Sequence, residues 1–244
     1  MDALPERRSR AAGVELTVVV PSFNEIDNVE PLIRRLESAL EGIEWEVIYV
    51  DDDSPDSTAD KVRELGRTNS RVRCMQRIGR RGLSTAVIEG MLASSAPYLA
   101  VIDADMQHDE KLLPLMLTTL KSDELDIVVG SRYVAGGTIA DWDKGRAAIS
   151  GIATRLARLI GTAALADPMS GFFMLHRSAF ERAMRQLSGQ GFKILLDLFA
   201  STPAPYRFKE LPYVFGERMY GESKLDSLVV WEYLMLLLDK LIGR

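Results

Sequence analysis

The first half of the chain alternates between short apolar runs and longer segments with apolar residues at helical spacing. A nearly continuous β-branched run, typical of a strand buried on both faces, occupies residues 15–21, and further strands are predicted over 46–50, 72–76, 98–102 and 126–130. Between them, apolar residues recur every three or four positions, which predicts helices over 29–40, 57–65, 83–94 and 110–121. This alternation indicates βαβ units, and hence an α/β fold with a mostly parallel sheet and helices on both faces.

After Gly130 the alternation stops. Two further strands are predicted over 171–176 and 208–215, and helical patterns cover 144–166, 179–187, 192–200 and 225–242. We find no linker-like composition, internal repeat or low-complexity tract. We therefore expect a flexible leader over 1–14, followed by one domain over 15–244 with a C-terminal elaboration.

Composition narrows the class of protein. The 244 residues are 47% apolar and 27% charged, which is typical of a globular domain. Cys74 is the single cysteine, so no internal disulfide is expected. A net charge of −5 argues against nucleic acid as the main partner. The most apolar stretch, Leu228–Ile242, contains Glu232, Asp239 and Lys240, so we expect no membrane span within this chain.

Polar residues follow four of the predicted strands. They form the segments Pro21–Glu25, Asp51–Asp56, Asp103–His108 and Gly130–Arg132. Ligands of parallel α/β sheets bind at the carboxyl ends of the strands, so these segments are the candidate site. The first of them has no glycine, which argues against a dinucleotide site or a P-loop because both need close backbone approach to phosphates.

The acidic segments favour a cation site. Asp103 and Asp105 stand two residues apart, and Gln107 adds a neutral oxygen. Oxygen ligands of this kind suit Mg²⁺ or Mn²⁺, which often bind one or two carboxylates together with substrate phosphates. Two alternatives stay open. Asp103 and Asp105 could be helix N-cap acids, and residues 51–56 could be turn and cap residues only.

Several segments resemble a known family. VVVPSFNE, VDDDSPDST, DADMQH, GSRY and SGFFMLHR, in this order, resemble the inverting glycosyltransferases of family 2, which have the GT-A fold. GFKILL and FGERMYGESKL are similar to segments of dolichol-phosphate mannose synthases and bacterial polyprenyl-phosphate glycosyltransferases. The resemblance extends from about residue 18 to 225. It implies a GT-A domain with a nucleotide and metal half over about 15–130 and an acceptor and interfacial half over about 131–244.

The resemblance also implies roles for individual residues. The nucleoside would be held by Pro21, Phe23, Glu25, Val50 and Asp52. Asp103 and Ala104 would contact the ribose and diphosphate, and Asp105 and Gln107 would bind the divalent metal. The phosphates and acceptor would meet near Arg132, Arg146, Lys193, Arg218 and Lys224. Of these residues, Asp105, Arg132 and Arg146 would be catalytic, with both arginines facing the acceptor phosphate.

These residues fit the chemistry of glycosyl transfer from a nucleotide donor. A lipid monophosphate is already anionic at neutral pH, so its oxygen attacks without a catalytic base. We expect transfer of mannose from GDP-mannose to a polyprenyl or dolichyl monophosphate, with inversion. The alternatives are UDP-glucose or another UDP-sugar as donor, a sugar hydroxyl as acceptor, or a non-catalytic sugar-nucleotide-binding module recruited to a membrane.

Residues 144–166 predict contact with a membrane. The segment contains Lys144, Arg146, Arg155 and Arg158 and no acid, and its apolar residues form a helical stripe. A basic amphipathic helix of this kind is typical of the bilayer interface, although a core-packed helix is the alternative. The apolar helix over 225–242 would pack on the domain, meet the membrane, or lead into transmembrane helices beyond this chain. We expect a peripheral protein at the cytoplasmic face of a membrane.

Overall fold

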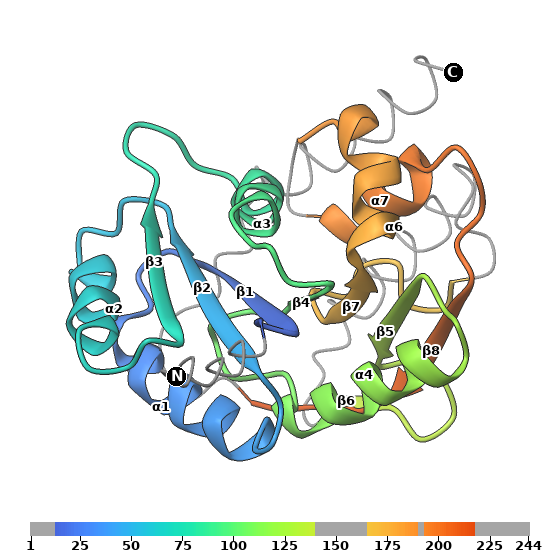
Figure 1. Ribbon diagram of the computed structural model, residues 1–244, viewed down its shortest axis with the longest axis horizontal. Helices are drawn as coiled ribbons and strands as arrows, with labels where there is room; N and C mark the ends of the chain where they lie inside the picture. The colour runs from blue at the N-terminus through green and yellow to red at the C-terminus, as the bar shows by residue number, and fades with distance from the viewer. Residues whose placement is uncertain (1–12, 140–164, 190–192, 218–244) are drawn as a thin grey trace, which may run out of the picture.

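The computed structural model describes residues 13–139, 165–189 and 193–217. Its main feature is a seven-stranded sheet in the order β3-β2-β1-β4-β7-β5-β8 (Figure 1). The strands are β1 (Leu16–Ser22), β2 (Trp45–Asp51), β3 (Val72–Gln76), β4 (Tyr98–Val101), β5 (Ile127–Ser131), β7 (Phe173–His176) and β8 (Phe208–Pro212). A second, two-stranded sheet pairs β6 (Thr138–Ile139) with β9 (Val214–Phe215).

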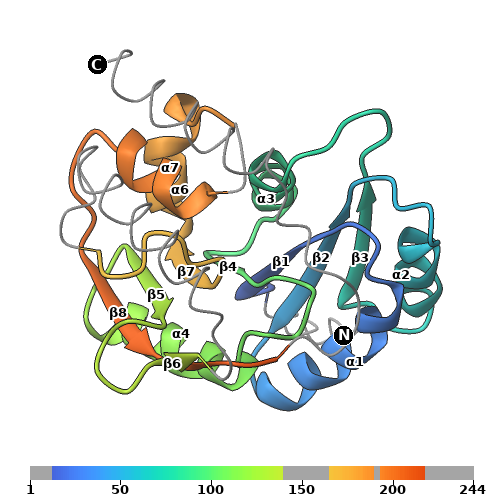
Figure 2. The same ribbon diagram turned by 180° about the vertical axis from the view of Figure 1, so that it is seen from behind.

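Helices cover both faces of the sheet (Figures 1 and 2). One face carries α1 (Ile26–Ala39), α2 (Thr58–Gly66) and α4 (Leu113–Ser122). The opposite face carries α3 (Leu83–Leu92), α6 (Arg177–Ala183) and α7 (Ile194–Ser201). Alternate residues of β1 explain its unbroken apolar run, since Val18 and Val20 pack toward the first group of helices and Val19 toward the second. The prediction of an α/β sheet with helices on both faces is confirmed.

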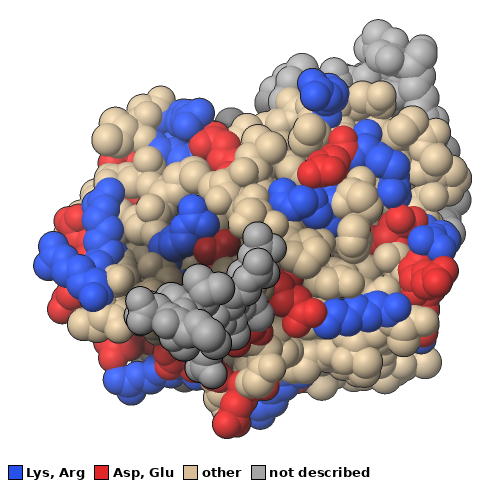
Figure 3. Space-filling model, viewed as in Figure 1, with Lys and Arg blue, Asp and Glu red and all other residues tan. Residues whose placement is uncertain are grey.

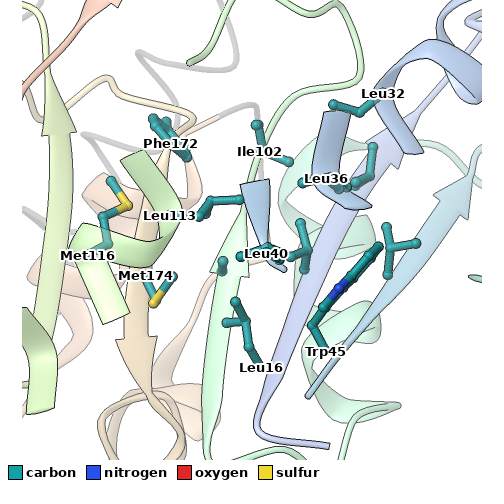
Figure 4. Packing of buried hydrophobic residues seen from close by; sticks show 14 of the residues in the cluster. Leu16, Leu32, Leu36, Leu40, Trp45, Ile102, Leu113, Met116, Phe172 and Met174 are labelled. Carbon is teal, nitrogen blue, oxygen red and sulfur yellow. The ribbon is translucent and has the colours of Figure 1, made fainter. Parts of the chain in front are cut away.

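The apolar stripe predicted for the first helix is buried as expected. Leu32, Leu36 and Leu40 are at most 1% exposed and pack beside Leu16 and Trp45 in the core (Figure 4). Burying one such side chain stabilises the fold by roughly 1.5–3 kcal/mol. This packing fixes α1 against the sheet, and therefore fixes the β1–α1 loop that contributes to the candidate site.

The position and direction of β7 could not be read from the sequence. β7 lies between β4 and β5 and is antiparallel to both, whereas the other neighbouring strands of this sheet run parallel. An antiparallel strand begins at the edge where its neighbours end. The residues that lead into β7, Asp167–Phe172, therefore lie at the carboxyl ends of β4 and β5.

Two predicted elements are divided in the structure. The predicted helix over 110–121 consists of a 3₁₀ turn (η1, Glu110–Leu112) followed by α4, because Pro114 has no N–H and suits the first turn of a new helix. The predicted strand over 208–215 is interrupted at Tyr213 between β8 and β9. Another 3₁₀ turn, η3 (Met184–Gln186), extends α6 within the predicted helix over 179–187.

Other predictions fall beyond what the structure describes. These are residues 1–12 of the predicted leader, nearly all of the basic helix over 144–166, and the helix over 225–242. Across residues 13–139, 165–189 and 193–217, no helix combines the length and the apolar character that a membrane crossing requires.

Candidate active site

The loop after β2 combines structural and site-facing acids. Asp51 holds the turn, since its carboxylate accepts hydrogen bonds from the N–H and hydroxyl of Ser54 at 2.9 and 2.5 Å. Asp56 likewise accepts from the N–H and hydroxyl of Thr58 at the start of α2, at 3.0 and 2.6 Å. The turn-and-cap interpretation therefore holds for Asp51 and Asp56. Asp52 has a different environment.

Asp52 is fixed by a buried arginine. The Arg77 side chain is 0% exposed and donates from Nε to Oδ1 of Asp52 at 2.7 Å, while the N–H of Gly82 donates to Oδ2 at 2.8 Å. Arg77 also donates to the Thr85 hydroxyl and the Gly82 carbonyl. A buried guanidinium with this many partners is rigid. Asp52 is thus held at the end of β2, and the 77–82 loop is held against it.

An open cavity of about 290 Å³ lies beside Asp52. It is lined by Asp52, Asp53, Gly79, Arg80 and Arg81. The guanidinium carbon of Arg81 lies 4.1 Å from the centre of the Phe23 ring, a favourable cation–π geometry. The structure therefore places Phe23 and Asp52, two residues predicted to hold a nucleoside, on adjacent loops with basic side chains around them.

The other residues predicted to hold the nucleoside are buried in the elements. Pro21 lies within β1 and Val50 within β2, where Val50 belongs to the core. Glu25 is 7% exposed and accepts a hydrogen bond from Nδ2 of Asn28 at 2.6 Å. These three residues shape the β1 and β2 ends from inside the fold, whereas the Phe23 side chain is partly exposed.

Asp103 occupies the centre of the strand-end edge. Its Oδ2 lies 3.1 Å from Nε2 of His108, and a Cβ placed on Gly171 would come within 2.6 Å of the same oxygen. Burial by itself raises the pKa of Asp103, but the hydrogen bond from His108 and the charges of Lys193 and Arg132 hold that pKa below its usual range. Asp103 is therefore ionised at neutral pH, and it does not cap a helix.

The fit of a divalent cation depends on Asp105 and Gln107. Oδ1 of Asp105 accepts the N–H of Gln107 at 3.2 Å, and Nε2 of Gln107 donates to the Gly216 carbonyl at 3.0 Å, which leaves the amide oxygen as a ligand. Within the described ranges, no group of three or more His, Cys, Asp or Glu side chains could hold a metal ion. These donors fit Mg²⁺ or Mn²⁺ shared with substrate phosphates, rather than an all-protein cage.

Arg132, which was predicted to contact the acceptor phosphate, forms an ion pair with a buried acid. Arg132 donates from Nε and Nη2 to the two carboxylate oxygens of Asp167, each at 2.8 Å, and its backbone N–H bonds Oδ2 at 3.1 Å. Burial would lower the pKa of Arg132, but the hydrogen bonds and charge of Asp167 outweigh it and raise that pKa. The guanidinium fork thus holds Asp167, and within the described residues Nη1 is the nitrogen that has no hydrogen bond.

Lys193 completes a group of alternating charges. Burial lowers its pKa, the nearby charge of Arg132 lowers it further, and the charges of Asp103 and Asp167 act in the opposite direction. The structure therefore brings together Asp103, Arg132 and Lys193, which lie far apart in the sequence. Ala104 is 4% exposed beside them. Arg146, Arg218 and Lys224 lie outside the described residues.

Charged side chains of both signs are interspersed over the face shown in Figure 3. This agrees with the modest net charge of −5. On this face the basic residues do not form one continuous patch.

Three residues of the site were not identified from the sequence. Arg77 directly follows β3, so the criterion applied to the other strand ends would have found it. Asp167 lies between two predicted elements, and its pairing with Arg132 was not expected. Glu210 on β8 accepts the backbone N–H groups of Ala166 and Asp167 at 2.8 and 2.9 Å, and no local pattern pointed to that role.

Comparison with known sequences gives a consistent result. Residues 17–183 match the model of glycosyl transferase family 2. A dolichol-phosphate mannosyltransferase of Pyrococcus furiosus is 37% identical over 91% of this chain, and this chain covers 62% of its length. The dolichol-phosphate mannosyltransferases of Saccharomyces cerevisiae and Mycosarcoma maydis are 37% and 38% identical, with 92% and 91% of this chain and 86% and 78% of theirs covered.

Solved structures share the fold. Glucosyl-3-phosphoglycerate synthase from Mycobacterium tuberculosis, in complex with Mn²⁺, UDP-glucose and phosphoglyceric acid, superposes with a TM-score of 0.66 at 20% identity. The match covers 93% of this chain and 80% of that chain. The same enzyme with Mg²⁺ and UDP gives a TM-score of 0.66 at 19% identity, covering 93% and 79%. At this identity the likeness concerns the fold.

Proposed function

The chain belongs to glycosyl transferase family 2 and has the GT-A fold, and from that premise we propose that it transfers mannose from GDP-mannose to a polyprenyl or dolichyl monophosphate with inversion. The observation that carries the proposal is the placement of Asp103 and Arg132 just after β4 and β5, with the charge of Lys193 acting on Asp103. The curated relatives act as dolichol-phosphate mannosyltransferases. The nucleotide and metal half would comprise about 15–130 and the acceptor half about 131–244.

The proposed reaction places two anionic substrates side by side. Transfer breaks the bond between C1 of the sugar and the diphosphate, and negative charge develops on the leaving diphosphate. Fixed cations at that position stabilise the transition state. Lys193 and the Nη1 end of Arg132 are the described groups that would supply this charge, and Arg146, Arg218 and Lys224 are further candidates.

The acceptor explains why no base is needed. A monophosphate has a second pKa of roughly 6, so its oxygen is already a nucleophile at neutral pH. Asp167 is 0% exposed and accepts three hydrogen bonds from Arg132, so its carboxylate faces the guanidinium and not an acceptor. This supports a phosphate acceptor rather than a sugar hydroxyl, which would have to lose a proton.

A divalent cation is part of the proposal. Asp105 and Gln107 would hold Mg²⁺ or Mn²⁺ together with the diphosphate. The ion would act as a Lewis acid on the departing diphosphate. Asp103 would then orient the ribose and diphosphate, and Phe23 with Asp52 would face the nucleoside.

A transfer assay tests this function. Labelled GDP-mannose and UDP-glucose are each incubated with a short polyprenyl phosphate or a sugar hydroxyl acceptor, with Mn²⁺ or with EDTA. We expect a lipid-linked mannose product that requires the cation. A product formed from UDP-glucose would refute GDP-mannose as the donor, and transfer to the sugar hydroxyl would refute the phosphate acceptor. Tight nucleotide binding without turnover would indicate a non-catalytic module.

Asp105→Ala should abolish cation-dependent transfer, at a cost of several kcal/mol in transition-state stabilisation. The matched control is Asp60→Ala, which removes an exposed acid from α2, away from the strand ends. Near-normal turnover in Asp105→Ala would exclude the assigned cation site.

Membrane attachment follows from the acceptor, because a polyprenyl chain stays in the bilayer. The proposed location is the cytoplasmic surface of a membrane. Flotation with anionic liposomes should carry the protein upward at low salt, and Arg155→Glu/Arg158→Glu should weaken this binding. A basic residue near an anionic surface contributes about 1 kcal/mol. A protein that stays at the bottom of the gradient with polyprenyl phosphate present would refute the membrane contact.

A further inference from the structure

Hydrogen bonds between side chains connect Asp103, through His108, with Tyr213 near the C-terminal end of the described residues. His108 is 4% exposed and lies between Asp103 and Tyr213, with Nε2 at 3.1 Å from Oδ2 of Asp103 and Nδ1 at 2.8 Å from the Tyr213 hydroxyl. The centres of the Phe172 and Phe215 rings lie 5.2 and 5.4 Å from the centre of its ring. These contacts fix the orientation of the imidazole ring.

The carboxylate partner of His108 assigns a proton to Nε2. Ionised Asp103 only accepts, so Nε2 of His108 must carry the proton of that bond. Nδ1 lies 2.8 Å from the Tyr213 hydroxyl, and burial raises the pKa of Tyr213, so this hydroxyl keeps its proton. In a neutral imidazole, a proton on Nε2 leaves Nδ1 as an acceptor, which pairs with the O–H of Tyr213.

Gln107, which precedes His108, is also bonded by residues close to Tyr213 in the sequence. The N–H of Gly216 donates to the backbone carbonyl of Gln107 at 2.8 Å, and Nε2 of Gln107 donates to the Gly216 carbonyl. Residues 213–216 thus bond both Gln107 and His108. The loop from Asp103 to His108 takes its shape from residues more than 100 positions later in the sequence.

We propose that His108 is a positioning residue, whose Nε2–H holds the Asp103 carboxylate toward the sugar nucleotide, and that Tyr213 fixes the tautomer that makes this possible. The proposal rests on the proposed function, since Asp103 is the residue taken to contact the ribose and diphosphate. His108 itself touches no substrate in this scheme. Groups that orient ligating carboxylates typically change affinity or activity by roughly 10- to 100-fold when removed.

The tautomer is measurable without any substrate. The chain has only two histidines, so ¹⁵N-histidine labelling gives two sets of ring signals, and His176→Gln assigns them. We expect the His108 ring to carry its proton on Nε2, with Nδ1 shifted by the Tyr213 hydroxyl. Tyr213→Phe should remove that shift, and Tyr206→Phe should not. A proton on Nδ1 in the wild type, or a ring unaffected by Tyr213→Phe, would overturn the proposal.

Tyr206 is a close control for Tyr213. It is 6% exposed against 4%, and its hydroxyl donates one hydrogen bond, to the Ala179 carbonyl at 3.0 Å. Each phenylalanine variant loses one buried hydroxyl and the hydrogen bonds that this hydroxyl makes. A purely structural effect would therefore be similar in the two, whereas a positioning role predicts weaker GDP binding in Tyr213→Phe alone.

Two substitutions of His108 separate its two nitrogens. Glutamine places an amide near the Nε2 position and still donates to Asp103, whereas asparagine reaches only the Nδ1 position. We expect GDP binding with Mg²⁺, measured by calorimetry, to weaken about 10- to 100-fold in His108→Asn and to be largely restored in His108→Gln. Equal affinities in wild type and His108→Asn would refute the positioning role. Absence of GDP binding in the wild type would instead refute the proposed function.

Discussion

The buried pair formed by Asp167 and Arg132 makes the strongest prediction about stability. Asp167→Asn keeps the size of the side chain but removes its charge. One of its two oxygens becomes an NH₂ group that faces the donors of Arg132. Asp167 is 0% exposed and accepts three hydrogen bonds, so no water replaces them directly.

The magnitude follows from this burial. Breaking a buried ion pair by removing one partner costs about 3–5 kcal/mol. The Arg132 side chain is 17% exposed, so part of its charge can be solvated, and we expect a value near the lower end, about 3 kcal/mol. Domains have unfolding free energies of about 5–15 kcal/mol, so this is a large share of the total. With an m-value of about 3 kcal/mol/M, the urea midpoint should fall by about 1 M.

Urea unfolding followed by circular dichroism measures this shift, and Asp60→Asn is the control. Asp60 pairs with Arg63 at the same 2.8 Å, but the two side chains are 75% and 45% exposed. Exposed pairs typically contribute about 0–1 kcal/mol, so the control should shift the midpoint several-fold less. Equal shifts in the two variants would refute the argument that burial gives the Asp167 pair its strength.

Three further predictions concern single residues. Gly171→Ala would place a Cβ 2.6 Å from Oδ2 of Asp103, so transfer should slow by up to about 100-fold while Gly13→Ala, in open space, stays near wild type in the same assay. The bonds and charges of two arginines outweigh burial and hold the pKa of Asp126 below 3.8, so Asp126→Asn should be less stable than wild type at neutral pH. Urea unfolding at several pH values should show the stability difference between wild type and variant shrinking as the pH falls through the lowered pKa of Asp126. A constant difference would contradict the assignment. Arg77→Lys keeps the positive charge but loses the planar guanidinium that bonds Asp52. This should lower the free energy of unfolding in urea by about 2 kcal/mol and weaken GDP binding. Unchanged GDP affinity would show that Arg77 does not support the nucleoside site.

The sequence was sufficient for most elements of the fold because their signals are local. An unbroken apolar run such as β1 means burial on both faces, and the spacing of Leu32 and Leu36 on α1, continued by Leu40 just after it, means one buried stripe. Local breaks were harder to place. Pro114 divided a predicted helix, and the strand predicted to reach Phe215 was interrupted at Tyr213.

The sequence also located the sheet edge that carries the candidate site, since Asp52, Asp103 and Arg132 each follow a strand. It did not give their partners. Asp103 meets His108 and Gly171, Arg132 meets Asp167, and Asp52 meets Arg77 only after the chain has folded. The roles of Asp52 in binding a nucleoside and of Arg132 in contacting the acceptor phosphate stay predictions.

What the sequence by itself determined was the set of βαβ elements and the chemical types of side chain at their carboxyl ends, because both depend on residues close together in the chain. What only the tertiary structure decided was how those side chains are held. The insertion of β7 between β4 and β5, antiparallel to both, brings Asp167 to Arg132 and Gly171 to Asp103. That placement depends on backbone pairing between β7 and strands that lie far from it in the sequence, which no local pattern of residues encodes.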